Sequence, residues 1–368
     1  MPKQQFAGGD GHARYLDTRA FASLDGLRAL SILAVVWFHT TNHIPAWPAL
    51  RRGFLGVDLF FIISGFLIVT LLLRERRDAG TISLRHFYVR RSLRIFPAYW
   101  AMLLLVACAA YLKPGAESAA LKRDLPYALF YISNLVPMTS LLAITWSLSA
   151  EEQFYLAVPT LQKYLPRFFP RIFLPMLYLL AILPPFGVFG DIRMPAFFRQ
   201  TTFGPILLGV MLAHVLDNAR GWKIVARLLG NPFSPLVALL LVGLALSYSG
   251  ADISGWPRLA IQMALLVLLA ACVVRERHVL VPVLTLWPLA RIGVVSYGIY
   301  LYHLLVYSPV SKVLDRFGVS SKYALFVAVA ACTWLAAEVS YRLFERRFLA
   351  LKKRFLPERS AADASMHR

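Results

Sequence analysis

Cysteine and charged residues are scarce in this chain. Only 16% of its 368 residues are charged, and cysteine occurs three times. Cys108, Cys272 and Cys332 lie singly in apolar segments, without the CxxC or Cys/His spacing of disulfide frameworks and zinc sites. We therefore expect packing roles for the three thiols, no metal site and no permanently bound cofactor.

Acidic residues are the scarcer of the two charge types, with 19 Asp and Glu against 39 Lys and Arg. The basic residues gather in short clusters between hydrophobic segments, which is typical of cytoplasmic loops and not of a nucleic-acid surface. The first 23 residues are polar and contain no apolar run of the kind a cleavable signal peptide needs. We expect the N-terminus to stay in the cytoplasm and no nucleic-acid partner.

Apolar residues, by contrast, make up 58% of the chain, and its mean hydropathy is +0.61. This composition is typical of a polytopic membrane protein embedded in the lipid bilayer. A transmembrane helix needs about 20 apolar residues. The preferred spans are 24–44, 53–73, 95–112, 146–165, 172–189, 201–217, 234–249, 257–274, 290–311 and 322–344.

One further apolar run, 125–145, is interrupted by Pro126, Asn134 and Pro137. If this run crossed the membrane, every later loop would change sides and the basic tail would lie outside, against the positive-inside rule. The predicted fold is therefore an all-α polytopic membrane protein of about ten transmembrane helices. It has a re-entrant or extracytoplasmic segment at 113–145 and both termini in the cytoplasm. Residues 1–23 and 348–368 form cytoplasmic ends around a membrane domain at 24–347.

The first span carries two ionisable residues, Arg28 and His39, in an otherwise apolar run. Such groups are costly inside a bilayer and usually have a function there. Eleven residues correspond to 1100°, close to a whole number of turns, so both side chains lie on one helix face ~16 Å apart. This face presents a permanent cation near the start of the helix and a titratable base deeper inside.

The segment Leu24–His39 resembles the opening of the acyltransferase-3 family of integral membrane O-acyltransferases. Four further segments resemble that family in the same order: Gly56–Phe66, Phe87–Trp100, Trp146–Tyr155 and Ser296–His303. The chain departs from the family pattern after the last span, where Glu345-Arg346-Arg347 stands in place of Glu-x-Pro. It resembles the stand-alone membrane domain, without the esterase-like domain fused to some members.

The resemblance implies transfer of an acyl group, usually acetyl, from cytoplasmic acyl-CoA to a hydroxyl. The acceptor would be a cell-surface glycan or a lipid-linked saccharide, such as lipopolysaccharide or exopolysaccharide, at the bacterial cytoplasmic (inner) membrane. The loops 113–145 and 190–200 would choose among acceptors. Direct transfer and a covalent acyl-enzyme on Ser64 or Ser147 both stay open, although no nucleophile elbow is present.

For the donor, Arg91 and Arg94 lie one helical turn apart at the predicted inner end of the third span. Arg28 lies at the same level on the first span. Three permanent cations suit the phosphates of coenzyme A, because bidentate charge-assisted bonds to phosphate are strong. The alternative for Arg91 and Arg94 is that they only obey the positive-inside rule.

For the acceptor, His39, Asp58 and Glu151 each lie five residues from a predicted outer span boundary, ~7 Å deep. Histidine suits the role of general base towards a hydroxyl, and a carboxylate such as Asp58 would orient its ring. The alternative for Asp58 is a helix cap. Trp146 and His303 are expected on the acceptor side, or as an interfacial anchor and a packed core histidine, respectively.

A second class of function also fits buried His, Asp, Glu and Arg groups in a multi-span protein. A proton-coupled secondary transporter uses such residues, usually with broken helices and internal symmetry. We find no internal repeat in this chain. Acyl transfer is therefore the preferred hypothesis, and consumption of the thioester donor distinguishes it from transport.

Overall fold

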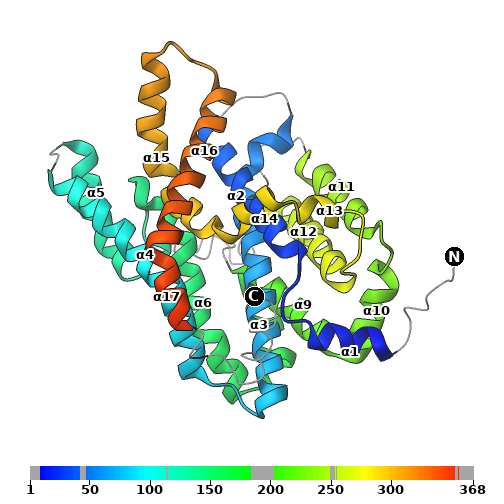
Figure 1. Ribbon diagram of the computed structural model, residues 1–368. Coiled ribbons are helices and arrows are strands. Elements are labelled where there is room, and N and C mark those ends of the chain that lie inside the picture. Colours follow the sequence, from blue (N-terminus) through cyan, green and yellow to red (C-terminus); the bar gives the residue numbers. More distant parts are fainter. Residues whose placement is uncertain are drawn as a thin grey trace. The chain divides into compact units, whose positions relative to one another are not determined.

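The computed structural model describes residues 9–41, 47–112, 115–183, 203–248, 253, 255–352 and 355. Within these residues the chain is mostly helical and contains no β-strand (Figure 1), as the predicted all-α class requires. They divide into two compact units. The first comprises residues up to Arg74 with most of 167–296, and the second comprises 75–166 with the residues from Tyr297 onward.

The helices of the first unit begin with a short N-terminal helix and continue with the apolar runs of the sequence. They are α1 (Gly9–Asp17), α2 (Ser23–Thr41), η1 (Pro48–Leu55), α3 (Gly56–Ala79), η4 (Phe169–Phe173), α7 (Leu174–Ile182), α9 (Gly204–Asp217), α10 (Ala219–Leu229), α11 (Ser234–Leu246), α12 (Trp256–Val274), α13 (Val281–Leu284) and α14 (Trp287–Val294). The last turn of α3 belongs to the second unit.

The second unit is built around a long helix of 29 residues, α4. Its helices are α4 (Leu84–Leu112), α5 (Ala116–Leu129), η2 (Ser133–Leu135), η3 (Leu141–Ile144), α6 (Thr145–Tyr164), α15 (Ser296–Arg316), α16 (Lys322–Ser340), η6 (Tyr341–Glu345) and α17 (Arg346–Lys352).

Four helical stretches among the described residues are long and apolar enough to cross a bilayer: Pro48–Ala79, Leu84–Leu112, Trp256–Val274 and Lys322–Leu351. The number rises to six if α10 with α11, and α14 with α15, each count as one bent crossing. The chain is therefore a polytopic membrane protein. The count of ten spans and the cytoplasmic termini stay predictions, and residues 1–8, 190–200 and most of 348–368 lie outside the described residues.

Contacts of the N-terminal segment bear on the topology. Arg74, at the end of the second predicted span, donates a hydrogen bond of 2.6 Å to the carbonyl of Tyr15. The Tyr15 ring stacks on Trp222 of α10 at 4.8 Å, and α1 lies beside α10 (Figure 1). The N-terminal segment and the segments after α3 and α9 must then share one side of the membrane. The chain must then cross the membrane an even number of times between Arg74 and Trp222. The ten-span prediction also places an even number of crossings between these two residues.

Glycine allows the helices of the first unit to approach closely. A Cβ atom on Gly65 of α3 would lie 2.0 Å from the carbonyl oxygen of Ile206 on α9. Reciprocally, a Cβ atom on Gly209 would lie 2.1 Å from the carbonyl oxygen of Ile62. Small residues that let backbones touch are a common basis of helix association in membranes. This contact fixes α3, which carries Asp58, against α9.

In the second unit, the region of the fourth predicted crossing consists of two helices that pack along α4. Helix α5 runs back along the outer half of α4, as two hydrogen bonds show. Ser118 donates to the carbonyl of Ala110, and Tyr99 donates to the carbonyl of Ala128 at 2.7 Å. Helix α6 continues along the inner half, where Tyr88 donates to the carbonyl of Leu156 at 2.9 Å. Together they follow α4 over ~33 Å, about the thickness of the hydrocarbon core.

The packing along α4 is compatible with a re-entrant segment at 113–145, and the crossing predicted at 146–165 stays a prediction. From this length we infer that the two helices form one interrupted crossing, whose break lies opposite the middle of α4, where Tyr131 stacks on Tyr99 at 4.5 Å. Polar residues fill the break: Ser133 Oγ lies 2.7 Å from Ser149 Oγ, and Asn134 donates to Gln153 at 3.0 Å. These hydrogen bonds pair polar side chains that hydropathy alone marks as loop residues. Polar groups inside a membrane need such protein partners, because no water is available there.

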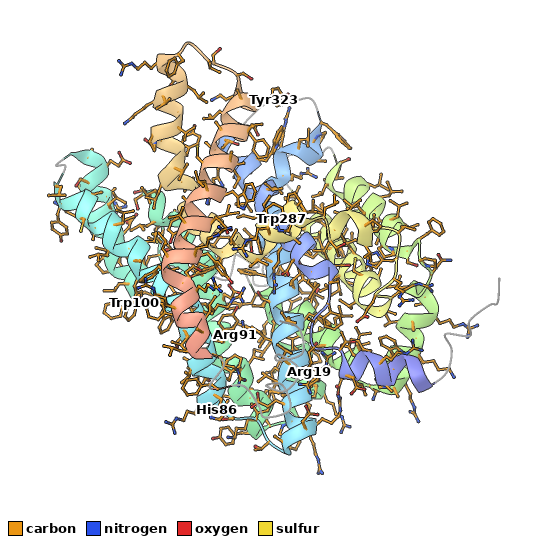
Figure 2. The ribbon with its side chains drawn as sticks, in the orientation of Figure 1. Arg19, His86, Arg91, Trp100, Trp287 and Tyr323 are labelled. Carbon is orange, nitrogen blue, oxygen red and sulfur yellow. The ribbon has the colours of Figure 1, made fainter. Side chains whose placement is uncertain are left out.

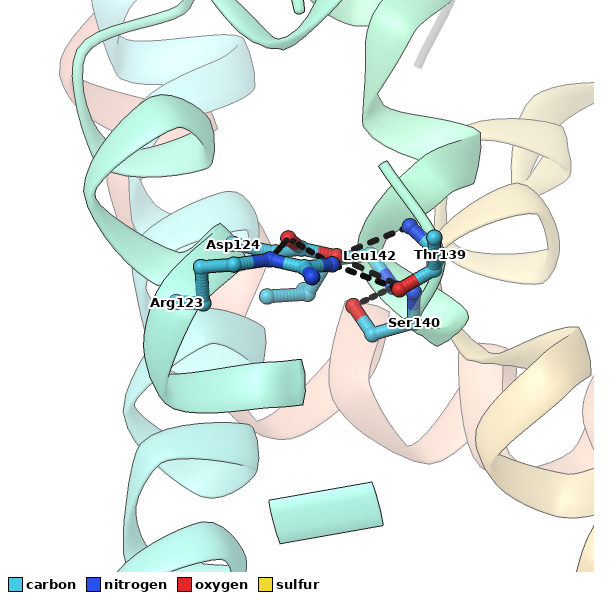
Figure 3. Close-up of polar contacts among 5 residues, drawn as sticks. All are labelled: Arg123, Asp124, Thr139, Ser140 and Leu142. Carbon is cyan, nitrogen blue, oxygen red and sulfur yellow. Dashed lines mark hydrogen bonds and ion pairs between the residues drawn. The ribbon is translucent and has the colours of Figure 1, made fainter. Parts of the chain in front are cut away.

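A buried carboxylate, Asp124 of α5, holds the end of this break (Figure 3). One oxygen accepts hydrogen bonds from the backbone N–H groups of Thr139 and Ser140, at 3.1 and 3.0 Å. The other accepts from Arg123 at 3.0 Å, while the same guanidinium donates to the Thr139 hydroxyl. Asp124 thereby fixes the turn that leads into α6.

We expect Asp124→Asn to destabilise the second unit by about 1–3 kcal/mol, the usual cost of leaving buried donors without their acceptor. An amide has one oxygen and one NH2 group, so either the two backbone N–H groups or the Arg123 guanidinium loses its acceptor. Thermal unfolding of the detergent-solubilised protein measures the effect. Glu117→Gln, at an exposed position of the same helix, is the matched control, and equal melting temperatures for the two variants would refute the role of Asp124.

Candidate functional site

Helix α2 positions two of the predicted site residues in the first unit, Arg28 and His39. Arg28 donates to Asp25, one turn earlier, in an ion pair of 3.0 Å that is partly exposed. His39 lies in the last turn of α2 and is partly buried. The helix is continuous from Ser23 to Thr41, so the predicted face with a cation and a base ~16 Å apart is present.

The His39 ring is held by the backbone of its own helix. Its Nδ1 lies 3.0 Å from the carbonyl oxygen of Val35, which can only accept a hydrogen bond. In the neutral ring the proton therefore lies on Nδ1 and the lone pair on Nε2. A main-chain carbonyl therefore orients the ring, and the predicted contact of Asp58 with His39 stays a prediction.

Asp58 has different partners. Its buried carboxylate accepts from Arg258 of α12 at 2.7 Å and from Gln262, one turn further along α12, at 3.2 Å. The Arg258 guanidinium also lies over the ring of Phe54, 5.7 Å from its centroid. Asp58 thus ties α3 to α12 through a buried ion pair. The sequence contained a signal for this pair. Arg258 lies at the start of the apolar run 257–274, and Asp58 lies near the start of the run 53–73.

Arg91 lies in the N-terminal third of α4, the end predicted to face the cytoplasm. It lies nine residues, or two and a half turns of α4, before Trp100, which is 52% exposed, so the two side chains project from opposite faces of the helix (Figure 2). Its guanidinium carbon lies 5.5 Å from the ring centroid of Tyr155 and 5.8 Å from that of Phe87. Arg91 therefore faces α6 and not lipid.

The glutamates of α6 lie around the same tyrosine. Tyr155 donates a short hydrogen bond to Glu151, and the charge of Arg91 acts on both Tyr155 and Glu152. The sequence analysis predicted Glu151 near the outer boundary and Arg91 at the inner mouth, and the shared contact with Tyr155 brings the two to a similar level. Glu151 and Glu152 are the seventh and eighth residues of α6, and through Tyr155 they lie at the level of Arg91 along α4.

Arg94 lies within electrostatic range of Glu345, whose carboxylate accepts from Ser340 at 3.0 Å. Glu345 belongs to the segment where the chain departs from the family pattern. Each of the three arginines predicted to bind phosphate is therefore accompanied by a carboxylate: Asp25 for Arg28, Glu152 for Arg91 and Glu345 for Arg94. A guanidinium has five N–H donors, so one carboxylate leaves others for a ligand.

The remaining predicted residues lie at the break of the crossing. His303 of α15 is buried, and its Nδ1 donates to the carbonyl of Tyr300 at 2.7 Å. The Tyr300 hydroxyl lies 2.6 Å from Ser147 and donates to the carbonyl of Ile144 at 2.9 Å. Trp146, next to Ser147 in α6, is partly buried. Tyr300 is a site residue that the sequence analysis missed, although it lies in the motif that ends at His303.

The arrangement provides groups for acyl transfer and none of the usual metal sets. Each unit contains cationic guanidinium groups, and α2 adds a histidine with an oriented ring. In the described part of the chain, no three His, Cys, Asp or Glu side chains gather as metal ligands.

Comparisons with known proteins bear on what these groups do. The family model described as an acyltransferase domain, Acyl_transf_3, matches residues 21–341. The chain belongs to the acyltransferase-3 family. The matched residues include all eight predicted site residues and both halves of the interrupted crossing, so each lies inside the acyltransferase domain.

Two Staphylococcus aureus proteins are similar to this acyltransferase. One, from strain COL and provisionally named O-acetyltransferase SACOL0978, is 31% identical over 369 residues, covering 92% of this chain and 59% of its own length. The O-acetyltransferase OatA of strain NCTC 8325 / PS 47 is 30% identical over 357 residues, covering 89% and 57%. The chain thus spans less than two thirds of these relatives. No solved structure matches it.

Proposed function

We propose that this acyltransferase is a membrane-bound O-acetyltransferase that transfers acetyl from cytoplasmic acetyl-CoA to a hydroxyl of a cell-surface glycan or lipid-linked saccharide. The names of the similar proteins support an O-acetyl product. The observation that carries the proposal is the oriented His39 ring on α2, with Arg28 on the same helix face. A bacterial inner-membrane location follows from this donor and acceptor.

In the proposed reaction, His39 Nε2 takes the proton of the acceptor hydroxyl as its oxygen attacks the thioester carbonyl. The C–S bond breaks, and the imidazolium returns the proton to the coenzyme A thiolate. The products are the acetyl ester and free coenzyme A. The Nδ1 bond to Val35 keeps the ring in the tautomer that this step needs, so a carboxylate partner is not required.

Arg28, Arg91 and Arg94 are proposed to bind the phosphates of the donor. Support comes from the position of Arg91 on the inward face of α4, where its aromatic and acidic neighbours fix the guanidinium. Trp146 and His303 are proposed to contact the acceptor. Glu151 lies at the level of Arg91, so we propose that it positions Tyr155 and Arg91.

The function is tested with proteoliposomes that contain the purified chain and acetyl-CoA labelled in the acetyl group. We expect release of coenzyme A thiol to depend on added glycan acceptor, with label appearing in that glycan. Accumulation of solute without consumption of the thioester would instead indicate a proton-coupled transporter. Surface glycan O-acetyl content in a deletion strain and its complement then identifies the acceptor.

We expect Arg91→Lys to raise the KM for acetyl-CoA about tenfold, with a smaller change in kcat. A lysine keeps the charge but loses the bidentate bonds that a guanidinium makes to phosphate. Initial rates at varied acetyl-CoA measure the effect. Arg85→Lys, an exposed residue of the same basic segment, is the matched control. An unchanged KM would assign Arg91 to topology and packing alone.

A further inference from the structure

Helix α10 combines cations and exposed apolar residues on its outer surface. Arg220, Lys223 and Arg227 are exposed, and at 100° per residue they fall within an arc of about 60°. Beside this arc lie Ile224, 61% exposed, and Leu228, 71% exposed. A helix of this kind, basic on one side and apolar on the next, is typical of the water–lipid interface.

The opposite face of α10 is fixed to the protein. Trp222 is buried, its ring packing on those of Tyr15 at 4.8 Å and His12 at 5.8 Å. The helix begins at Asn218, whose side chain accepts from two backbone N–H groups of the first turn. It ends at Gly230, whose carbonyl accepts from Arg275 at 2.8 Å. Ile224 and Leu228 are therefore held outward on a docked helix.

The direction of α10 is set by the helix that follows. The axes of α10 and α11 differ by 78°. Helix α11 is apolar on all sides, with Leu240 and Leu244 65% and 72% exposed, as expected of a helix that lies among lipid chains. If α11 runs along the membrane normal, α10 lies nearly in the membrane plane.

We propose that α10 is an interfacial helix that binds anionic phospholipid at the cytoplasmic leaflet. Ile224 and Leu228 enter the acyl-chain boundary, and Arg220, Lys223 and Arg227 bind the phosphate groups of the lipids. Charge complementarity favours anionic phospholipid as the ligand. The cytoplasmic leaflet carries a negative surface potential, which attracts clusters of lysine and arginine.

The other way to place α10 is as the inner half of a broken span with α11. Three exposed cations would then lie in the hydrocarbon region, where charged side chains are costly and need partners. The contacts of Tyr15 with Trp222 and Arg74 also favour the surface, since they join α10 to the polar N-terminal segment.

The depth of α10 is measured with nitroxide labels in the full-length protein, reconstituted in nanodiscs of phosphatidylcholine and phosphatidylglycerol. Cys108, Cys272 and Cys332 are first replaced by alanine, and single cysteines are introduced by Leu228→Cys and Lys223→Cys. We expect oxygen to relax the Leu228 label more than a water-soluble nickel chelate does, and the reverse at Lys223. Leu240→Cys on α11 is the control for the acyl-chain region.

The proposal is overturned if the labels at positions 223 and 228 both respond to the same relaxing agent. Two labels that both respond to nickel place α10 in water, and two that both respond to oxygen place it in a broken span.

The lipid preference is measured by the association of spin-labelled phosphatidylglycerol relative to spin-labelled phosphatidylcholine. Each cation near an anionic surface contributes a factor of up to about five. We therefore expect the preference of the protein to fall severalfold in Lys223→Gln/Arg227→Gln. The matched control is Lys312→Gln/Arg316→Gln, at exposed positions of α15. An equal loss in both double variants, or no loss in either, would refute a specific role for α10.

Discussion

Replacing His39 with alanine is expected to lower kcat by about 10²–10⁴-fold, the usual contribution of a positioned general base. The acceptor hydroxyl has a far higher pKa than any side chain, so its attack on the thioester needs a group that removes the proton. His39 supplies Nε2 for this step because Nδ1 is engaged with Val35. The KM for acetyl-CoA should change little, since the proposed donor contacts are arginines.

The measurement is coenzyme A release at varied acetyl-CoA, together with the pH profile of kcat. We expect the acid limb of that profile to disappear in His39→Ala, and added imidazole to restore part of the rate. His86→Ala is the matched control, because His86 is exposed on α4 (Figure 2) and lies outside the proposed site. Normal kcat in a correctly folded His39→Ala protein would end the general-base assignment.

Asp58→Asn is expected to cost about 3–5 kcal/mol of stability, because it leaves the Arg258 guanidinium in a protein interior without its carboxylate. The pair is mostly buried, with 18% of the Arg258 side chain and 4% of the Asp58 side chain exposed. Arg258→Met should be destabilising for the same reason, as Asp58 would then be the uncompensated charge. The double variant Asp58→Asn/Arg258→Met should recover much of the loss.

Thermal unfolding of the three variants in detergent gives this coupling, and kcat of the folded fraction separates stability from catalysis. Asp25→Asn is the control, since its partly exposed ion pair with Arg28 should contribute less than about 1 kcal/mol. The alternative is that Asp58 acts on the His39 ring. In that case Asp58→Asn would lower kcat strongly at normal stability, and Arg258→Met would not.

The two outcomes differ in what they assign to the first unit. A stability effect makes Asp58 a positioning residue that joins α3 to α12. An effect on kcat alone would make it a partner of the base, as the spacing in the sequence first indicated. Because His39 Nδ1 already donates to Val35, the structure favours the positioning role.

The interrupted crossing of α5 and α6 has a consequence for donor binding. Broken helices place polar groups and helix ends inside a membrane, where a ligand can reach them. Here the break is filled by tyrosine, serine and asparagine side chains. Arg91 lies on α4 about two helical turns before Tyr99, towards the predicted cytoplasmic end. A thioester whose phosphates lie near Arg91 would extend towards this break along α4.

The sequence by itself determined that the chain is an all-helical membrane protein, where several of its long apolar helices lie, and that Arg28 and His39 share one helix face. These features depend on local composition and on the 3.6-residue period, which can be read from residues close together in the chain. The five motifs also gave the family.

Only the tertiary structure decided the partner of Asp58, the neighbours of Arg91 and the path of the fourth crossing. Arg258 lies 200 residues from Asp58, and Tyr155 lies 64 residues from Arg91, so no local pattern could join them. Hydropathy counted 146–165 as a full span because it registers apolar length and not depth. The contacts of α6 with α4 place Tyr155, whose hydroxyl donates to Glu151, against Arg91.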